Sequence, residues 1–177
     1  MDPDAKYLAG YLLGDGMIKH YRHSGYEVKL TEKDERHAHY LADLMARVLE
    51  VKPSVSRDKR RNAMRIRVFR KSAYEKARTL VETALKEPDP HLIGGLFDAE
   101  GDYTDSKRRI RFTNKDSNLV RLVVDYLREN GVLCHVYVRR RGKSVWFIVE
   151  VYGKHAFRLL SLLDLRHPKW SKIRSSR

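Results

Sequence analysis

Two acidic residues occupy matching places in this sequence, each beside a glycine at the end of an apolar segment. Asp15 lies between two glycines, and Glu100 lies between Ala99 and Gly101. An acidic residue is unfavourable at a helix C-terminus, where the helix dipole is negative. Either site alone would indicate only a turn, because Gly often ends helices and Asp is common in turns. An acidic residue at this unfavourable position in both segments instead indicates a function.

The apolar segments before these acids align residue for residue. Small residues occur four apart in both, Gly10 and Gly14 in the first and Gly95 and Ala99 in the second. This spacing lets two helix backbones approach closely, an effect best documented in membranes. If the helices pack in parallel, both carboxylates meet beside the last helix carbonyls, and such oxygen ligands suit Mg²⁺. Divalent ions that bridge two carboxylates can activate water and stabilise the leaving oxygen of a phosphodiester.

The charge balance points to the same kind of substrate. The 177 residues include 37 Lys and Arg against 23 Asp and Glu, a formal net charge of +14, so nucleic acid is the first partner to expect.

The acidic start is unlike a signal peptide, and no apolar run approaches the roughly 20 residues of a transmembrane helix. The single cysteine, Cys134, excludes an internal disulfide and a Cys-rich zinc site. Glutamine is absent and 34% of the residues are charged, which favours a thermophilic source. We therefore expect an intracellular, cytoplasmic protein without a membrane partner, from a prokaryote such as a thermophilic archaeon.

The same order of elements is predicted twice. The first half should form a helix from residue 3 to about 14, strands at 17–22 and 26–31 around a turn near Ser24, a helix at 35–50, strands at 54–57 and 63–69, and a helix at 72–85. The second should form a short helix from Asp89-Pro90 into Glu100, a hairpin at 103–113, a helix at 117–130, strands at 134–139 and 145–151, and a helix at 155–163. The stretch Thr31-Glu32-Lys33-Asp34 also returns as Thr113-Asn114-Lys115-Asp116. We interpret this as an internal duplication, an α+β fold with halves at residues 1–86 and 89–177.

The two motifs resemble those of the LAGLIDADG homing endonucleases, in the single-chain, intron-encoded form that carries two motifs. The resemblance is carried by Leu8-Ala9-Gly10 with Asp15-Gly16, and by Ile93-Gly94-Gly95-Leu96 with Asp98-Ala99-Glu100-Gly101. It implies two pseudo-symmetric αββαββα halves, a saddle of antiparallel sheets on DNA, and a central pair of motif helices. It also implies metal-dependent cleavage of both strands, with Asp15 and Glu100 as ligands helped by the carbonyls of Gly14 and Ala99. Mg²⁺ or Mn²⁺ would support cleavage, and Ca²⁺ would be a non-cleaving substitute.

The resemblance also suggests auxiliary catalytic residues. A glutamine or similar polar residue often lies near the metals in this family, and here those positions hold Glu32 and Asn114. Glu32 departs from the common amide, so it could orient water, add metal affinity, or simply be tolerated. A basic residue near the last helix of each half often completes such sites. Lys86 and Lys169 are the candidates, and solvated surface lysines would fit the same pattern equally well.

The strand patterns predict sheets with one face on a core and the other on nucleic acid. In the strand at 63–69, Met64, Ile66 and Val68 share one face while Arg65 and Arg67 share the other. Arginine can contact guanine through two hydrogen bonds, so these faces should give sequence specificity, whereas the basic hairpin tips should bind phosphates. The tail at 169–174 should add backbone contacts. The residues expected to contact DNA are Lys19, Tyr21, Lys29, Lys33, Arg57, Lys59, Arg60, Arg61, Arg65, Arg67, Lys107, Arg109, Arg111, Lys115, His135, Tyr137, Arg139, Arg140, Arg141 and Lys143.

Three functions remain open. The leading hypothesis is a monomeric endonuclease that cuts a long, asymmetric double-stranded site and so promotes intron mobility, because the halves differ at nearly every DNA-facing position. The alternative is a maturase that uses the same saddle on an intron RNA without DNA cleavage. A DNA-binding regulator would tolerate neutral residues at both acidic positions, and would usually carry an added recognition domain. Retention of both Asp15 and Glu100 favours the endonuclease.

Overall fold

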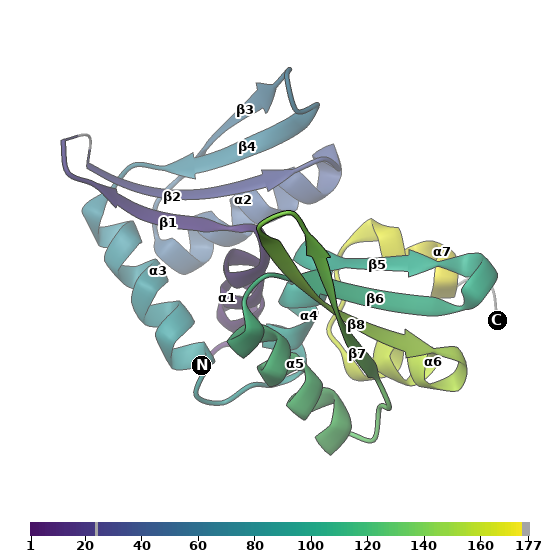
Figure 1. The fold of residues 1–177 in the computed structure, drawn as a ribbon. Helices are drawn as coiled ribbons and strands as arrows, with labels where there is room; N and C mark the ends of the chain where they lie inside the picture. Colours follow the sequence, from purple (N-terminus) through teal and green to yellow (C-terminus); the bar gives the residue numbers. More distant parts are fainter. Residues whose placement is uncertain (24, 175–177) are drawn as a thin grey trace.

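The computed structural model describes residues 1–23 and 25–174 and consists of two similar lobes (Figure 1). The first lobe comprises α1 (Pro3–Asp15), β1 (Met17–Tyr21), β2 (Gly25–Glu32), α2 (Glu35–Leu49), β3 (Ser54–Asp58), β4 (Ala63–Val68) and α3 (Lys71–Ala84). The second comprises α4 (Pro90–Glu100), β5 (Gly101–Thr104), β6 (Arg109–Asn114), α5 (Ser117–Glu129), β7 (His135–Arg141), β8 (Ser144–Tyr152) and α6 (Gly153–Leu162), with a 3₁₀ turn, η1 (Asp105–Lys107), between β5 and β6. The predicted elements are present with ends that differ by at most two residues, whereas the turn predicted at Ser24 lies outside the described residues. None of the described helices is long and apolar enough to cross a membrane.

Each lobe contains one four-stranded antiparallel sheet. The strand orders are β1-β2-β4-β3 and β5-β6-β8-β7, so the second sheet repeats the first. In each sheet one face packs on helices, and alternate residues such as Leu30 and Ile66 are fully buried there. The other face is left open between the lobes (Figure 1). This arrangement confirms the duplicated α+β architecture.

The first helix of each lobe begins in the same way. The Asp2 carboxylate accepts a hydrogen bond from the Ala5 amide at 3.2 Å, and Asp89 accepts one from the Leu92 amide at 3.0 Å. A proline follows each aspartate, at a helix position where its missing N–H costs nothing. The Asp-Pro pairs therefore mark both helix starts, as the sequence predicts.

Helices α1 and α4 pack side by side at the centre of the molecule. A Cβ atom on Gly10 would lie only 2.0 Å from the Leu92 carbonyl oxygen, and one on Gly95 would lie 2.2 Å from the Tyr7 carbonyl oxygen. Gly14, one turn after Gly10, faces Ala99. Because the contacts advance in the same direction along both helices, the pair is parallel, and its two C-terminal ends meet.

The segment after α6 is structured, although the sequence pattern predicts no element there. It forms a 3₁₀ turn, η2 (Pro168–Trp170), and a short helix, α7 (Ser171–Arg174). Trp170 and Ile173 are buried in the second lobe's core rather than displayed on a basic arm. Arg166 crosses to the first lobe, where Nη1 donates hydrogen bonds of 2.6 Å to Asp4 and to the Tyr40 hydroxyl. The segment therefore connects the two lobes, and the DNA contacts expected of the tail at 169–174 stay a prediction.

Candidate functional site

Two carboxylates meet where the central helices end. Asp15 is the last residue of α1 and Glu100 is the last residue of α4. A Cβ atom on Gly14 would lie 3.2 Å from Cγ of Glu100 and 2.6 Å from Cβ of Ala99. Glu100 therefore lies against the final turn of α1, beside Asp15. The structure brings together the four residues that the sequence suggests as metal ligands.

The ionised forms of both carboxyl groups are disfavoured, mainly by burial. Burial raises the pKa of Glu100 to about 7, and the negative charge of Asp15 adds to this rise. Burial also raises the pKa of Asp15, with a contribution from Glu32, while Arg61, Lys169 and Lys29 oppose it. Among the described residues no hydrogen-bond donor contacts the Asp15 carboxylate. Two half-buried carboxylates at adjacent helix C-termini fit a divalent cation, whose charge would favour both ionised forms.

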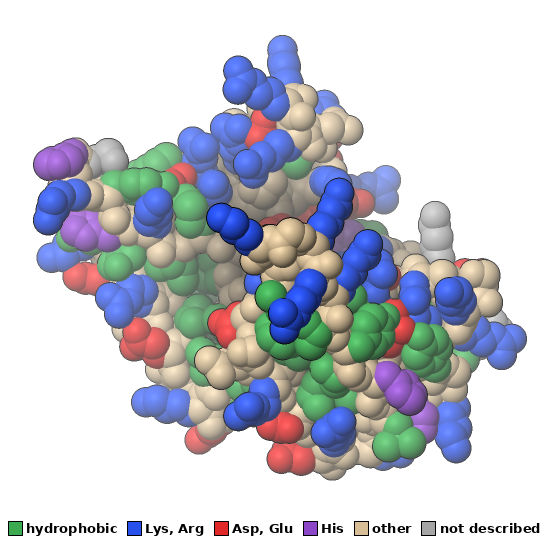
Figure 2. Space-filling model, viewed as in Figure 1, with side chains coloured by type: hydrophobic (Ala, Val, Ile, Leu, Met, Phe, Trp, Pro, Cys, Tyr) green, Lys and Arg blue, Asp and Glu red, His purple; other side chains and the backbone are tan. Residues whose placement is uncertain are grey.

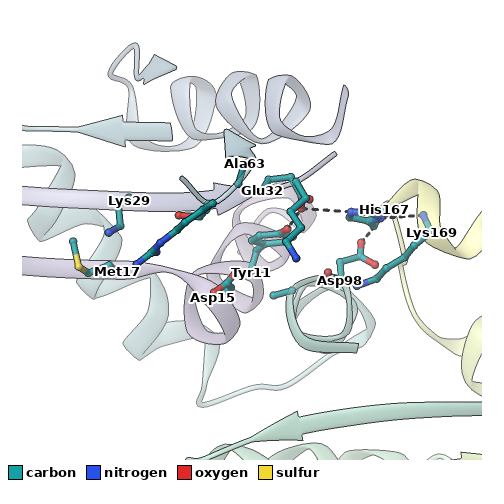
Figure 3. Close-up of a pocket in the computed structure, with 13 residues that line it drawn as sticks. Tyr11, Asp15, Met17, Lys29, Glu32, Ala63, Asp98, His167 and Lys169 are labelled. Atoms are coloured by element: carbon teal, nitrogen blue, oxygen red, sulfur yellow. Dashed lines mark hydrogen bonds and ion pairs between the residues drawn. The ribbon is translucent and has the colours of Figure 1, made fainter. Parts of the chain in front are cut away.

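Each acid faces the sheet of its own lobe. Asp15 lines a pocket of about 540 Å³ together with Lys29, Glu32 and Lys169 (Figure 3). Glu100 lines a second hollow of about 350 Å³ with Asp102 and Arg111 and other residues of β6, β7 and β8. The paired acids thus open onto two hollows, one on each side of the central helices.

Glu32 and Asn114 occupy equivalent positions but have different partners. A side-chain oxygen of each accepts the amide two residues later, that of Asp34 at 2.8 Å and that of Asp116 at 2.9 Å. Asn114 also donates a 3.3 Å hydrogen bond from Nδ2 to Oε1 of Glu100, so it orients that acid. No comparable bond joins Glu32 to Asp15 among the described residues.

The second oxygen of Glu32 is already engaged. It accepts a hydrogen bond from the Tyr11 hydroxyl and lies 3.4 Å from Nε2 of His167. Burial would raise the pKa of Glu32, but hydrogen bonds from His167, Tyr11 and the Asp34 amide lower it to about 2. Glu32 is therefore an ionised group that ties α1 and the C-terminal segment to β2.

Glu32, His37 and His167 also form a cluster whose possible metal-ligating atoms lie within 4.8 Å of one another. However, Nδ1 of His167 accepts the Lys169 amide at 2.9 Å, so a neutral imidazole carries its proton on Nε2, the atom that faces Glu32. Binding a metal through Nε2 would break the bond to Lys169. We interpret the cluster as a hydrogen-bonded contact between the lobes.

Lys169 reaches the end of α4, whereas Lys86 does not. Lys169 Nζ donates hydrogen bonds to the carbonyl oxygens of Asp98 at 2.6 Å and Gly101 at 2.8 Å, and burial lowers its pKa. Lys86 is exposed and precedes Asp89, which begins α4. Helix α4, whose 11 residues span about 16 Å, carries Glu100 at its far end. Of the two candidate lysines, only Lys169 is near the acid pair.

Sequence reasoning missed Asp98, the anchor of the C-terminal segment. This buried carboxylate accepts hydrogen bonds from the Tyr7 hydroxyl at 2.6 Å, from the amides of Arg166 at 2.7 Å and His167 at 2.9 Å, and from the Trp170 indole. An acid within the apolar motif, one residue before Ala99, was the available signal. Its partners lie 91 residues earlier, at Tyr7, or 68 to 72 residues later, so they left no local pattern.

Basic residues surround the open faces of the sheets. Figure 2 shows Lys and Arg side chains gathered around the hollow between the β3–β4 tip and the β7–β8 hairpin. Two expected DNA contacts lie elsewhere: Arg57 pairs with Met64 and Arg140 pairs with Val145, which places them on the opposite faces of their strands. The open faces and their adjoining turns carry the other residues predicted to contact DNA, namely Lys19, Tyr21, Lys29, Lys33, Lys59, Arg60, Arg61, Arg65, Arg67, Lys107, Arg109, Arg111, Lys115, His135, Tyr137, Arg139, Arg141 and Lys143.

Comparisons with known proteins agree with this architecture. A solved structure titled as I-DmoI in complex with DNA and Mn has a TM-score of 0.76 at 23% identity, over 93% of this chain and 98% of that one. The homing endonuclease I-WcaI bound to its DNA recognition sequence has a TM-score of 0.67 at 12% identity, over 97% of this chain and 85% of that one. Both likenesses concern the fold.

A curated relative is the DNA polymerase of Thermococcus kodakarensis (strain ATCC BAA-918 / JCM 12380 / KOD1), 24% identical over 143 residues. The match covers 77% of this chain and only 9% of that polymerase. The family described as the LAGLIDADG-like domain matches twice, at residues 2–81 and again at residues 88–163. These two matches take in most of the sequence, and the chain therefore belongs to the LAGLIDADG-like domain family, with one copy of the domain in each lobe.

Proposed function

We propose that this chain is a metal-dependent DNA endonuclease of the homing type. It would hydrolyse one phosphodiester in each strand of a long, asymmetric double-stranded target. The observation that carries the proposal is the parallel helix pair, which presents Asp15 and Glu100 between two basic sheet faces. The structural neighbours whose titles describe complexes with DNA and with Mn or Ca support both the substrate and the cofactor.

The residues around the acid pair have separable roles in this reaction. Asp15 and Glu100, with the carbonyl oxygens of Gly14 and Ala99, would hold Mg²⁺ or Mn²⁺. The bound ions would lower the pKa of water and stabilise the charge on the leaving oxygen. Asn114 keeps Glu100 in place through its 3.3 Å hydrogen bond. Lys169 binds two carbonyl oxygens at the end of α4 and offsets the negative charge there.

The two sheets differ enough to require an asymmetric target. In the first sheet Glu27 of β2 is paired with Arg67 of β4, whereas in the second sheet Arg109 of β6 is paired with Glu150 of β8. These pairs occupy equivalent positions of the two sheets with the charges exchanged. Such faces would read different bases in each half-site. A single chain with both lobes would act as a monomer, and cleavage of an intron-free locus would promote intron mobility.

The test is cleavage of a plasmid that carries the intron-insertion locus with the intron removed. Wild type should linearise it in Mg²⁺ and bind without cutting in Ca²⁺, and Asp15→Asn or Glu100→Gln should abolish cutting. Glu129→Gln, a change at an exposed acid on α5, should cut normally. Mg²⁺-dependent cutting that survives both site substitutions would refute the site assignment. Accelerated splicing of the intron RNA without any DNA cleavage would instead identify a maturase.

A further inference from the structure

Two arginines on the open sheet faces are held by carboxylates in the same unusual way. Oδ2 of Asp58 accepts Nε of Arg65 at 2.9 Å and also accepts Nη2 of the same guanidinium. Oδ2 of Asp102 accepts Nε of Arg111 at 2.9 Å and its Nη2 at 2.7 Å. The side chains of both arginines remain 36% exposed. Each guanidinium is thus fixed along one edge and open along another.

The free edge is the one that can recognise a base. A guanidinium has five N–H donors, and the carboxylate uses the one on Nε and one on Nη2. The donors on Nη1 and the second donor on Nη2 remain along the outer edge. This planar fork matches the O6 and N7 acceptors of guanine in the major groove. Because the carboxylate already holds the fork, binding a base would restrict it little further.

The other two arginines of β4 and β6 lack this arrangement. Nη1 of Arg109 donates to Glu150 at 2.7 Å and Nη2 donates to the Thr104 hydroxyl at 3.1 Å, so its outer edge is engaged, and its side chain is only 15% exposed. Nε of Arg67 lies 3.4 Å from Glu27, and among the described residues it has no hydrogen-bond partner. The four arginines share one sequence pattern but therefore differ in how many N–H donors remain free to bind DNA.

We propose that Arg65 and Arg111 each read one guanine, one in each half-site, and that Asp58 and Asp102 are the positioning residues that aim them. The proposal rests on the proposed function, because it assumes a DNA target across the two sheets. Asp58 is almost fully buried, and its Oδ1 accepts the backbone amides of Arg60 at 3.1 Å and Arg61 at 3.4 Å. It therefore links the phosphate-binding tip of the first lobe to the base-reading arginine.

The test is repeated selection from a pool of duplex DNA with a randomised segment, with Ca²⁺ present so that bound DNA is not cut. Wild type should enrich a sequence with a fixed guanine in each half. Asp58→Asn and Arg65→Lys should each weaken the preference for the first guanine by about 5- to 150-fold and leave the second unchanged. Asp102→Asn and Arg111→Lys should do the reverse.

These substitutions keep the fold and most of the charge. Asn at 58 can still accept the tip amides through its Oδ1, and the Asp102 side chain is 45% exposed, so its loss leaves no buried group unpaired. Arg60→Ala is the control, since loss of a phosphate contact should lower affinity for all sequences alike.

The outcomes distinguish failure of the guanine assignment from failure of the proposed endonuclease function. Enrichment of a sequence whose guanine preferences are unchanged in the four variants would overturn the assignment of the arginines and leave the endonuclease proposal standing. A uniform loss of affinity, without a change of preference at either guanine, would also overturn it, because the aspartates would then serve only the fold. If wild type enriches no sequence, the proposed function fails and this inference fails with it.

Discussion

Replacement of Glu100 by glutamine should stabilise the metal-free protein while abolishing its activity. The pKa of this carboxyl rises from 4.5 to about 7 on folding, so its ionised form is disfavoured in the folded state. At 1.36 kcal/mol for each pH unit, the full cost to the folded state above pH 7 would be about 3 kcal/mol, and solvent screening of this half-buried group reduces it to about 2 kcal/mol. The neutral amide of Glu100→Gln avoids this cost. For a chain of this size the gain corresponds to a rise in Tm of about 4–8 °C.

The pH dependence identifies the cause. The folded state binds the extra proton between the unfolded and folded pKa values, so the wild type loses stability as the pH rises from about 4.5 to about 7. Thermal unfolding followed by circular dichroism in EDTA should therefore show the full difference at pH 8. At pH 4, where the carboxyl is protonated in both states, the difference should be nearly absent.

Two comparisons make the measurement decisive. Glu129→Gln, at an exposed position of α5, should leave Tm unchanged at both pH values. Ca²⁺ at pH 8 should raise the Tm of the wild type more than that of Glu100→Gln, because the ion needs the charge that the substitution removes. If Glu100→Gln is no more stable than wild type at pH 8, or is equally stabilised at pH 4, the reasoning about the paired carboxylates is refuted.

Three further substitutions test other parts of the structure. Asp98→Ala leaves several buried donors without an acceptor, so it should lower the free energy of unfolding by about 3–5 kcal/mol in urea titrations. The control Asp125→Ala, at an exposed site of α5, should change it by less than about 0.5 kcal/mol. Equal effects of the two substitutions would contradict the anchoring role of Asp98. Gly10→Ala would place a Cβ atom 2.0 Å from the Leu92 carbonyl oxygen, so it should force the helices apart, lower Tm and reduce cleavage, and an unchanged protein would argue against the close helix contact. Arg60→Ala should reduce the slope of log affinity against log salt concentration by about 0.9, the value for one lost phosphate contact, and an unchanged slope would remove this residue from the interface.

The sequence predicts those parts of the fold that depend on local pattern. Asp-Pro pairs mark the starts of both central helices, and alternation along β4 predicts which side chains of the sheet are buried. The spacing of Gly10 and Gly14 predicts the close helix pair because backbone contact at one helix turn requires small residues at that interval. Repetition of these signals makes the acid pair recognisable from the order of the residues alone.

The remaining features depend on contacts between distant residues. Nothing near Glu32 indicates that its carboxylate meets His167, and nothing near Asp98 indicates that it binds the Trp170 indole. Lys86 was misplaced because the alignment of the two halves is loose after their last helices. The different hydrogen bonds of Arg65 and Arg109 could not be predicted either, since both show the same alternation and differ only in the neighbouring acids.

The segment at residues 164–170 has a consequence for how the protein is made. Arg166 contacts Asp4, and His167 contacts Glu32, so groups from the first 32 residues wait for partners that are synthesised more than 130 residues later. During translation the first lobe can form its sheet, but the buried acid Glu32 then has only its partners Tyr11 and Asp34 and lacks His167. A nascent chain stalled before residue 164 would therefore carry both central helices but lack the contacts of Arg166, His167 and Lys169 that complete the site.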